Sequence, residues 1–273
     1  RLRNNFKEVP AFFINAGPSL DRALPLLTAY APRALFFASD TALPALMEQG
    51  IEPDFVLTVD PQERSFDHFR EYTHAHSILL FTPTAAREVV RHYRGKKMVV
   101  LQKEHSLTKQ FEEELGYKGT TTAGSSVSCM GLDILLQMGC NPIVFIGTDY
   151  AFPGGKAYSS HIAATKKWPH QVSRLNTLES MHRDVLEDHK VISATDKFGR
   201  EVLTHQTLYL YLKQIETIVA QHSTVRFYSF MSQGASIEGV ESLVLCEELD
   251  ALLQGPMKPT LCIDDDSLDE ELK

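Results

Sequence analysis

The chain has 273 residues, a formal net charge of −8, 43% hydrophobic residues and 23% charged residues. This composition is typical of a globular protein, and the negative balance gives no electrostatic drive toward nucleic acid. The four cysteines show no Cys-x-x-Cys spacing, which favours free thiols in a reducing, cytoplasmic setting over a disulfide or zinc framework. No apolar run approaches the roughly 20 residues of a membrane span, and no secretory signal is visible.

Short β-rich runs alternate with helical patterns along the chain. The runs cover residues 11–14, 34–38, 55–59, 78–81, 98–101, 143–147 and, more weakly, 225–229. Helical patterns cover residues 20–30, 42–49, 85–93, 127–138 (with Gly139 as a C-cap) and 208–219. This alternation predicts an α/β fold with a doubly wound, mostly parallel, Rossmann-like sheet.

The sequence divides into three parts by composition. Residues 1–149 together with 206–255 carry the alternating pattern and form the predicted Rossmann-like domain. Residues 150–205 are polar, have a poor strand signal and contain a helical pattern at 176–189, so we expect an insertion or lid, or else an irregular surface excursion. Residues 256–273 form an acidic tail. The chain begins without Met, so we expect a processed chain or a piece of a longer one, with a homo-oligomer left open.

The first β-rich run ends in a loop of the kind that binds phosphate. Residues Asn15, Ala16, Gly17, Pro18 and Ser19 lie between this run and a helical pattern. Glycine lets a ligand approach the backbone, proline stiffens the turn and serine caps the helix. The N–H groups and dipole of a helix N-terminus attract phosphate, although an ordinary strand–helix turn has the same sequence.

Three further strand ends carry polar side chains. These residues are Ser39, Asp40 and Thr41; Asp60; and Thr148, Asp149 and Tyr150. Because ligands bind at the carboxyl ends of parallel strands, together they predict a small-molecule site, while each alone is consistent with a helix cap. Asp40, Asp60 and Asp149 are of the type that holds a hard cation.

A second small-residue loop leads into the helical pattern at 127–138. Its polar or flexible members are Thr122, Gly124, Ser125 and Ser126, and they suit a phosphate or carboxylate. No Gly-Lys-Ser/Thr follows, so it is not a P-loop, and the first loop is not the dinucleotide fingerprint. Both absences argue against a standard kinase and an NAD enzyme.

Residues 149–161 combine a glycine pair with groups that transfer protons. His161 is a candidate general base, and Tyr150 and Tyr158 are candidate hydrogen-bond donors to a leaving phosphate. The chain has 11 histidines, so a plain surface histidine is the simpler alternative for any one of them.

In this order, the motifs resemble the motility-associated factor (Maf) flagellin glycosyltransferases and the archaeal 6-hydroxymethylpterin diphosphokinases. The first and fourth also resemble bacterial CMP-sialic-acid sialyltransferases. The pieces that carry the resemblance are residues 15–20; 40–43 with 50–54 and Asp60; 122–127; 147–151; and 199–204 with 233–237.

The resemblance implies a cytoplasmic transferase of the motility apparatus, with no obligatory metal. Its donor would be a CMP-activated nonulosonic acid bound by the Rossmann-like domain, and its acceptor a Ser or Thr hydroxyl of flagellin. By this likeness Asn15, Gly17 and Ser19 approach the nucleotide, and Ser125 and Ser126 contact the donor phosphate or carboxylate. Asp149 and Tyr150 border the donor, and His161 takes the place of the base.

Two alternatives stay open. The first is a Mg²⁺-dependent diphosphokinase that transfers pyrophosphate from ATP to a pterin alcohol, with Phe36, Phe37 and Phe152 as candidate walls for the pterin ring. The second is a nucleotide-sugar-binding domain of the flagellar system without catalytic activity.

Overall fold

The computed structural model describes residues 2–103, 108, 110, 114, 120–121, 126–162, 190–255 and 257–259. Its centre is an eight-stranded sheet with the order β12-β11-β8-β1-β2-β3-β4-β5, in which every neighbouring pair is parallel. The strands are β1 (Ala11–Ile14), β2 (Leu35–Ser39), β3 (Phe55–Thr58), β4 (Ile78–Phe81), β5 (Lys97–Val99), β8 (Ile143–Ile146), β11 (Phe227–Phe230) and β12 (Glu241–Leu243).

The strand order reverses at β1. The chain builds β2 to β5 outward on one side of β1, and β8, β11 and β12 outward on the other. This is the predicted doubly wound α/β fold. The reversal between β1 and β8 is a topological switch point, where the loops after two adjacent strands turn apart and leave room for a ligand.

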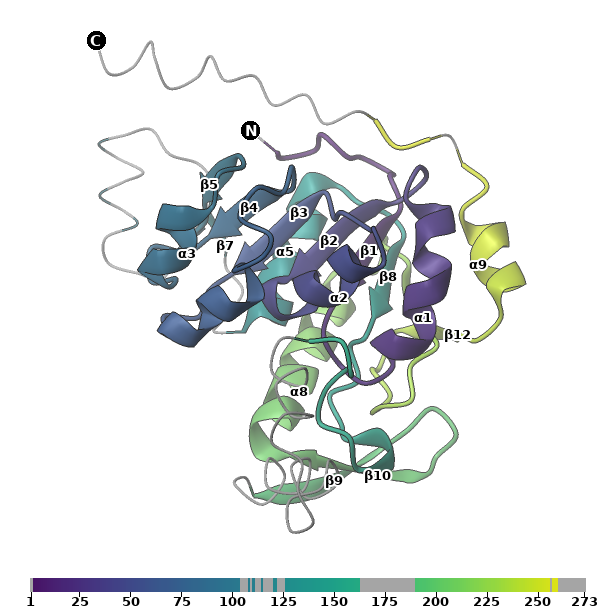
Figure 1. Cartoon of the computed structure of the whole chain (residues 1–273). Helices are drawn as coiled ribbons and strands as arrows, with labels where there is room; N and C mark the ends of the chain where they lie inside the picture. The colour runs from purple at the N-terminus through teal and green to yellow at the C-terminus, as the bar shows by residue number, and fades with distance from the viewer. Residues whose placement is uncertain are drawn as a thin grey trace.

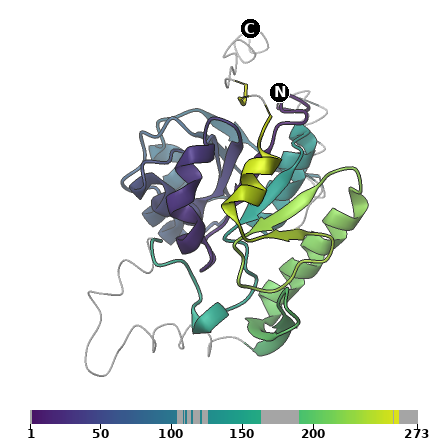
Figure 2. The ribbon, with the colours of Figure 1, turned by 90° about the vertical axis from the view of Figure 1, so that its right-hand side faces the viewer.

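Helices cover both faces of the sheet (Figures 1 and 2). One face carries α1 (Leu20–Leu27), α2 (Leu43–Glu48) and α9 (Cys246–Leu252), and the other carries α5 (Val127–Met138) and α8 (Gln206–Gln221). A further helix, α3 (Arg87–His92), packs with β3 and β4. Short 3₁₀ turns lie at Thr28–Tyr30 (η1), Asp40–Ala42 (η2), Glu63–His68 (η3) and Pro153–Gly155 (η4).

Alternate residues of the central strands fill two separate core layers. Phe12 and Phe36 pack with α1, whereas Phe13 and Phe37 pack with α5. All four side chains are fully buried, as expected for strands covered on both faces. Helix α5 ends at Gly139, which has φ +84° and donates to the last carbonyls, so the predicted C-cap is confirmed.

The structure differs from the predicted elements in several places. The run at 98–101 divides, because β6 (Leu101–Gln102) leaves the main sheet and pairs with β7 (Thr120–Thr121). No strand was predicted within residues 150–205. The structure has an antiparallel hairpin there, formed by β9 (Val191–Thr195) and β10 (Glu201–His205). Its side chains are mostly exposed or half-buried, so no apolar alternation marks it. The helical pattern at 176–189 lies outside the described residues.

Candidate functional site

The loops that follow β1 and β8 are joined at the switch point. Asn15 N donates to Ile146 O at 2.8 Å, and Gly17 N donates to Gly147 O at 2.7 Å. A Cβ atom on Gly17 would lie 2.5 Å from both Gly147 O and Asp149 Oδ2. Gly17 therefore permits close approach, as predicted, but the described group that needs the space is the neighbouring turn of the protein itself.

Asp149 holds this turn together from a buried position. Only 2% of the residue is exposed. Its Oδ2 accepts from Ser19 N at 2.8 Å, and its Oδ1 accepts from Ser232 Oγ at 3.3 Å and Gln233 N at 3.4 Å. Burial raises the pKa of Asp149, and the donated hydrogen bonds of Ser19 and Gln233 oppose that rise.

The carboxylate of Asp149 thus occupies the N-terminus of α1, where the sequence analysis placed a bound phosphate. It satisfies the amide of Ser19 and complements the positive end of the helix. The predicted side-chain cap is wrong, because the hydroxyl of Ser19 makes no capping hydrogen bond. In this arrangement Asp149 is a positioning residue for the loop.

A polar network links the same turn to the start of α5. Asn15 Nδ2 donates to Thr148 Oγ1 at 2.9 Å, and Ser128 Oγ lies 3.4 Å from Asn15 Oδ1. Ser126 is the N-cap of α5, and its hydroxyl accepts from Cys129 N at 3.1 Å. The start of α5 therefore lies beside the loop after β1. Thr122, Gly124 and Ser125 lie outside the described residues.

Two buried hydroxyls on either side of this turn make no hydrogen bond of good geometry to a described residue, although each lies close to a polar side chain. They are Ser19 Oγ, close to the carboxylate of Asp149 at the start of α1, and Tyr150 Oη, close to Ser128 of α5. Ser19 is fully buried and Tyr150 is 6% exposed. Burial raises the pKa of Tyr150 far above its ordinary value, so the phenol stays protonated and able to donate.

A second polar cluster lies at the ends of β2 and β3. Asp40 Oδ1 accepts from Thr41 N at 2.7 Å, and Oδ2 accepts from Thr58 Oγ1 at 2.7 Å. Asp40 is 4% exposed, and burial raises its pKa. Asp60 instead accepts from Gln62 N at 2.9 Å within its own loop. The structure therefore separates these strand ends into two local networks.

The three aspartates do not meet as a cation site. Within the described part of the chain no three His, Cys, Asp or Glu residues are grouped to hold a metal ion. That Asp40, Asp60 and Asp149 can hold a hard cation stays a prediction. The three carboxylates are not grouped because that of Asp40 accepts a hydrogen bond from Thr58 and that of Asp149 accepts one at the start of α1.

The segment that contains His161 crosses the loop after β1. Ser159 N donates to Ala16 O at 2.9 Å, and Ser160 Oγ donates to Asp21 at 2.7 Å. His161 follows directly, with its Nδ1 3.6 Å from Glu48 Oε2 of α2. The predicted base therefore lies on the same edge of the sheet as the switch-point turn, with a carboxylate 3.6 Å from its ring.

Sequence reasoning missed the residues that enclose Asp149 and Tyr150 from the other side. Ala235 N donates to Asp149 O at 2.8 Å, and Thr204 Oγ1 donates to Tyr150 O at 2.7 Å. A Cβ atom on Gly234 would lie 2.0 Å from Asp149 O. The signal was present, since residues 199–204 and 233–237 were among the motifs that carried the resemblance, but no role had been assigned to them.

A switch-point turn flanked by two helix N-termini defines the molecule as an α/β protein of the class that binds ligands at the carboxyl ends of its strands. The family model of 6-hydroxymethylpterin diphosphokinase MptE-like proteins matches residues 1–155. The chain belongs to this family.

Two individual proteins are also similar. An uncharacterized protein from Treponema pallidum (strain Nichols) is 31% identical over 94 residues, which are 34% of this chain and 40% of that protein. The structure of the MAf glycosyltransferase from Magnetospirillum magneticum AMB-1 matches with a TM-score of 0.67 and 16% identity, over 88% of this chain and 34% of that chain. The two chains share this fold, and our chain spans less than half the length of either protein. No described helix has the length and apolar character needed to cross a bilayer.

Proposed function

We propose that the chain is a glycosyltransferase that moves a nonulosonic acid from a CMP-activated donor to a Ser or Thr hydroxyl of flagellin. The observation that carries this proposal is the pair of buried hydroxyls that make no hydrogen bond of good geometry to a described residue, Ser19 and Tyr150, on either side of the switch-point turn. They offer hydrogen bonds to a polar ligand at the place where this fold class binds one. The fold shared with a MAf glycosyltransferase supports the same reading.

The donor chemistry suits the groups present. Such a donor carries one phosphate and one carboxylate. Since Asp149 already fills the start of α1, we assign an anionic group of the donor to the start of α5, where Ser126, Ser128 and Asn15 gather. Tyr150 would donate to the departing phosphate.

The reaction itself exchanges one carbon–oxygen bond for another. The bond from the anomeric carbon to the CMP phosphate breaks, a bond to the acceptor oxygen forms, and the acceptor proton passes to a base. We assign the base to His161, oriented by Glu48. This chemistry needs stabilisation of the leaving phosphate and does not require a metal ion.

A second candidate, pyrophosphoryl transfer from ATP to a pterin alcohol, is favoured by the description of the family. Its predicted aromatic walls fit poorly, because Phe36 and Phe37 are buried in the two core layers. Phe152 is 5% exposed and lies 5.5 Å from the ring of His205.

Turnover assays separate the candidates. With a CMP-activated nonulosonic acid and flagellin we expect release of CMP, and His161→Ala should abolish this release while CMP still binds. Release of AMP from ATP, Mg²⁺ and 6-hydroxymethyl-dihydropterin, with no release of CMP, would contradict the proposal. Binding of CMP without any turnover would indicate a non-catalytic domain.

A further inference from the structure

In the β9–β10 hairpin, the backbone N–H and C=O groups of alternate residues point outward, away from the partner strand. Asp196 N donates to Arg200 O at 2.8 Å, and the register continues this pairing, with Ala194 opposite Val202 and Ile192 opposite Thr204. Hydrogen-bonded and non-hydrogen-bonded pairs alternate in an antiparallel ladder. The backbone N–H and C=O groups of Ser193, Thr195 and Leu203 therefore face outward from the hairpin.

The two outer edges of the hairpin differ in what covers them. On the β10 side, Leu203 O accepts from Phe152 N at 2.8 Å. On the β9 side, Thr195 O accepts from Ser236 N at 2.8 Å, while the backbone N–H and C=O of Ser193 bond to no described residue. Among the described residues, the β9 side is thus unpaired at Ser193, and we call this stretch the open edge. An unpaired strand edge can template the addition of another strand.

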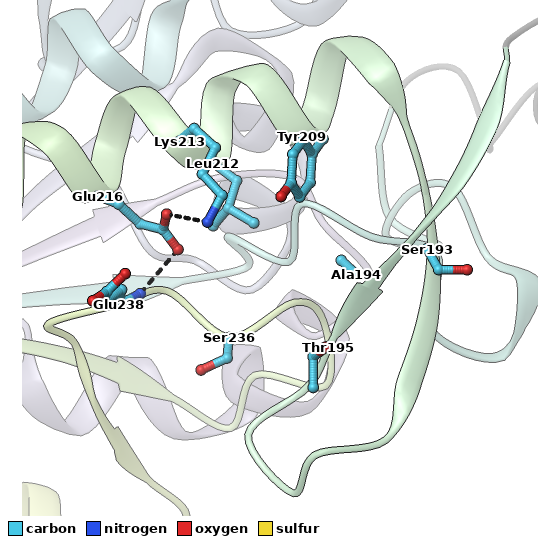
Figure 3. Close-up of a pocket in the computed structure, with 9 residues that line it drawn as sticks. All are labelled: Ser193, Ala194, Thr195, Tyr209, Leu212, Lys213, Glu216, Ser236 and Glu238. Atoms are coloured by element: carbon cyan, nitrogen blue, oxygen red, sulfur yellow. Dashed lines mark hydrogen bonds and ion pairs between the residues drawn. The ribbon is translucent and has the colours of Figure 1, made fainter.

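A pocket of about 390 Å³ lies beside this open edge (Figure 3). Figure 3 shows α8 on one side of the space, β9 on another and the turn through Ser236 and Glu238 on a third. Ala194 and Ser236 are small, which leaves room for the side chains of an incoming segment, and Leu212 contributes an apolar surface.

The charges of the pocket select against acidic ligands. Lys213 Nζ lies 2.6 Å from Glu216 Oε2, and Glu238 N donates to Glu216 Oε1 at 3.1 Å. Lys213 is therefore neutralised by Glu216, and the carboxylate of Glu238 adds a negative charge to the lining. A neutral or weakly basic polar segment fits this balance.

We propose that an extended segment of the protein acceptor, rich in Ser and Thr and free of acidic residues, adds as a strand to the open edge of β9. Main-chain hydrogen bonds to Ser193 would supply affinity, and the pocket would receive alternate side chains. The hairpin also contacts the switch-point turn, because Thr204 of β10 donates to Tyr150 O. The identification of the segment as the acceptor rests on the proposed function, but the docking itself does not.

The experiment uses the whole chain and a fluorescein-labelled octapeptide of alternating Thr and Val, with fluorescence anisotropy as the readout. Ser193→Pro removes the outward N–H and leaves the bonds of β9 to β10 in place. Ser193→Ala is the matched control, because it keeps the N–H. We expect Ser193→Pro to weaken peptide binding about tenfold, the equivalent of one main-chain hydrogen bond, and Ser193→Ala to bind like the wild type.

Two modified peptides test the proposal on the unaltered protein. N-methylation of every second residue should abolish binding, and replacement of the central Thr by Glu should weaken it. Equal binding by the N-methylated peptide, or no binding of the parent peptide at 1 mM (roughly −4 kcal/mol), would overturn the edge-pairing proposal. CMP binding is measured in parallel. If CMP fails to bind while the peptide binds, the proposed function is wrong and the docking edge stands.

Discussion

At the scale of single residues, the site depends on which buried polar atoms have partners. Asp149 uses both carboxylate oxygens to hold the turn between α1 and the loop of residues 232–234. Ser19 Oγ and Tyr150 Oη make no hydrogen bond of good geometry to a described residue. Asp149 therefore holds the turn through hydrogen bonds of its own, and we propose the two hydroxyls as contacts of the ligand.

Ser19→Ala tests that division of roles. We expect the free energy of unfolding to change by less than about 0.5 kcal/mol, because the removed hydroxyl makes no described hydrogen bond. CMP should bind several-fold more weakly, the effect of one lost hydrogen bond. Isothermal titration calorimetry and urea unfolding measure the two quantities.

Ser77→Ala is the matched control, because Ser77 Oγ is also buried without a described partner but lies just before β4, at the opposite edge of the sheet. A loss of CMP affinity in Ser77→Ala equal to that in Ser19→Ala would count against a specific contact.

Asp40 predicts a pH dependence of stability. Burial raises its pKa above the ordinary 3.8, against the opposing effects of Thr58 and His68. The folded state therefore binds the proton more tightly than the unfolded state, and this contribution is present below pH 3.8 and is lost as pH rises through the folded pKa. Urea unfolding from pH 4 upward should show wild-type stability falling relative to Asp40→Asn. If the free energy of unfolding of the wild type stays constant or grows relative to that of Asp40→Asn as pH rises, the pKa of Asp40 is not raised.

At the scale of elements, two serines in equivalent N-cap positions have opposite roles. Ser126 caps α5 through its hydroxyl, whereas Ser19 at the start of α1 is replaced in that role by Asp149. We expect Ser126→Ala to destabilise the protein by about 1 kcal/mol, and Ser19→Ala to have no such effect. Similar midpoint shifts for the two variants in thermal unfolding would refute the distinction.

The elements that the sequence predicted well are those with buried, periodic side chains. Strand β1 and helix α5 have the predicted bounds because their apolar spacing reports directly on burial. The hairpin β9–β10 and the edge strand β12 escaped prediction because they are short or half-exposed. The hairpin is defined by its backbone hydrogen bonds and by the turn at Gly199, which has φ +76°. Neither feature produces an apolar pattern in the sequence from which a strand could be predicted.

At the scale of the whole molecule, the order of strands and helices along the chain predicted that the loops after the strands would lie at one edge of the sheet. It did not predict which residues of those loops would contact one another. Gly17 was predicted to let a ligand approach the backbone, yet its described neighbour is Asp149, 132 residues further along the chain. Asp40, Asp60 and Asp149 likewise fall into separate hydrogen-bond networks. Contacts between distant segments depend on side-chain direction, and spacing along the chain does not report it.

We expect the switch-point turn between β1 and β8 to bind a CMP-linked donor. Differential scanning fluorimetry with CMP, CDP, UDP, ADP and ATP, each with and without Mg²⁺, tests it most directly. We expect CMP to raise the melting temperature most, without a need for Mg²⁺, and Ser19→Ala to reduce this rise. Stabilisation by ATP with Mg²⁺ that far exceeds stabilisation by CMP would contradict it.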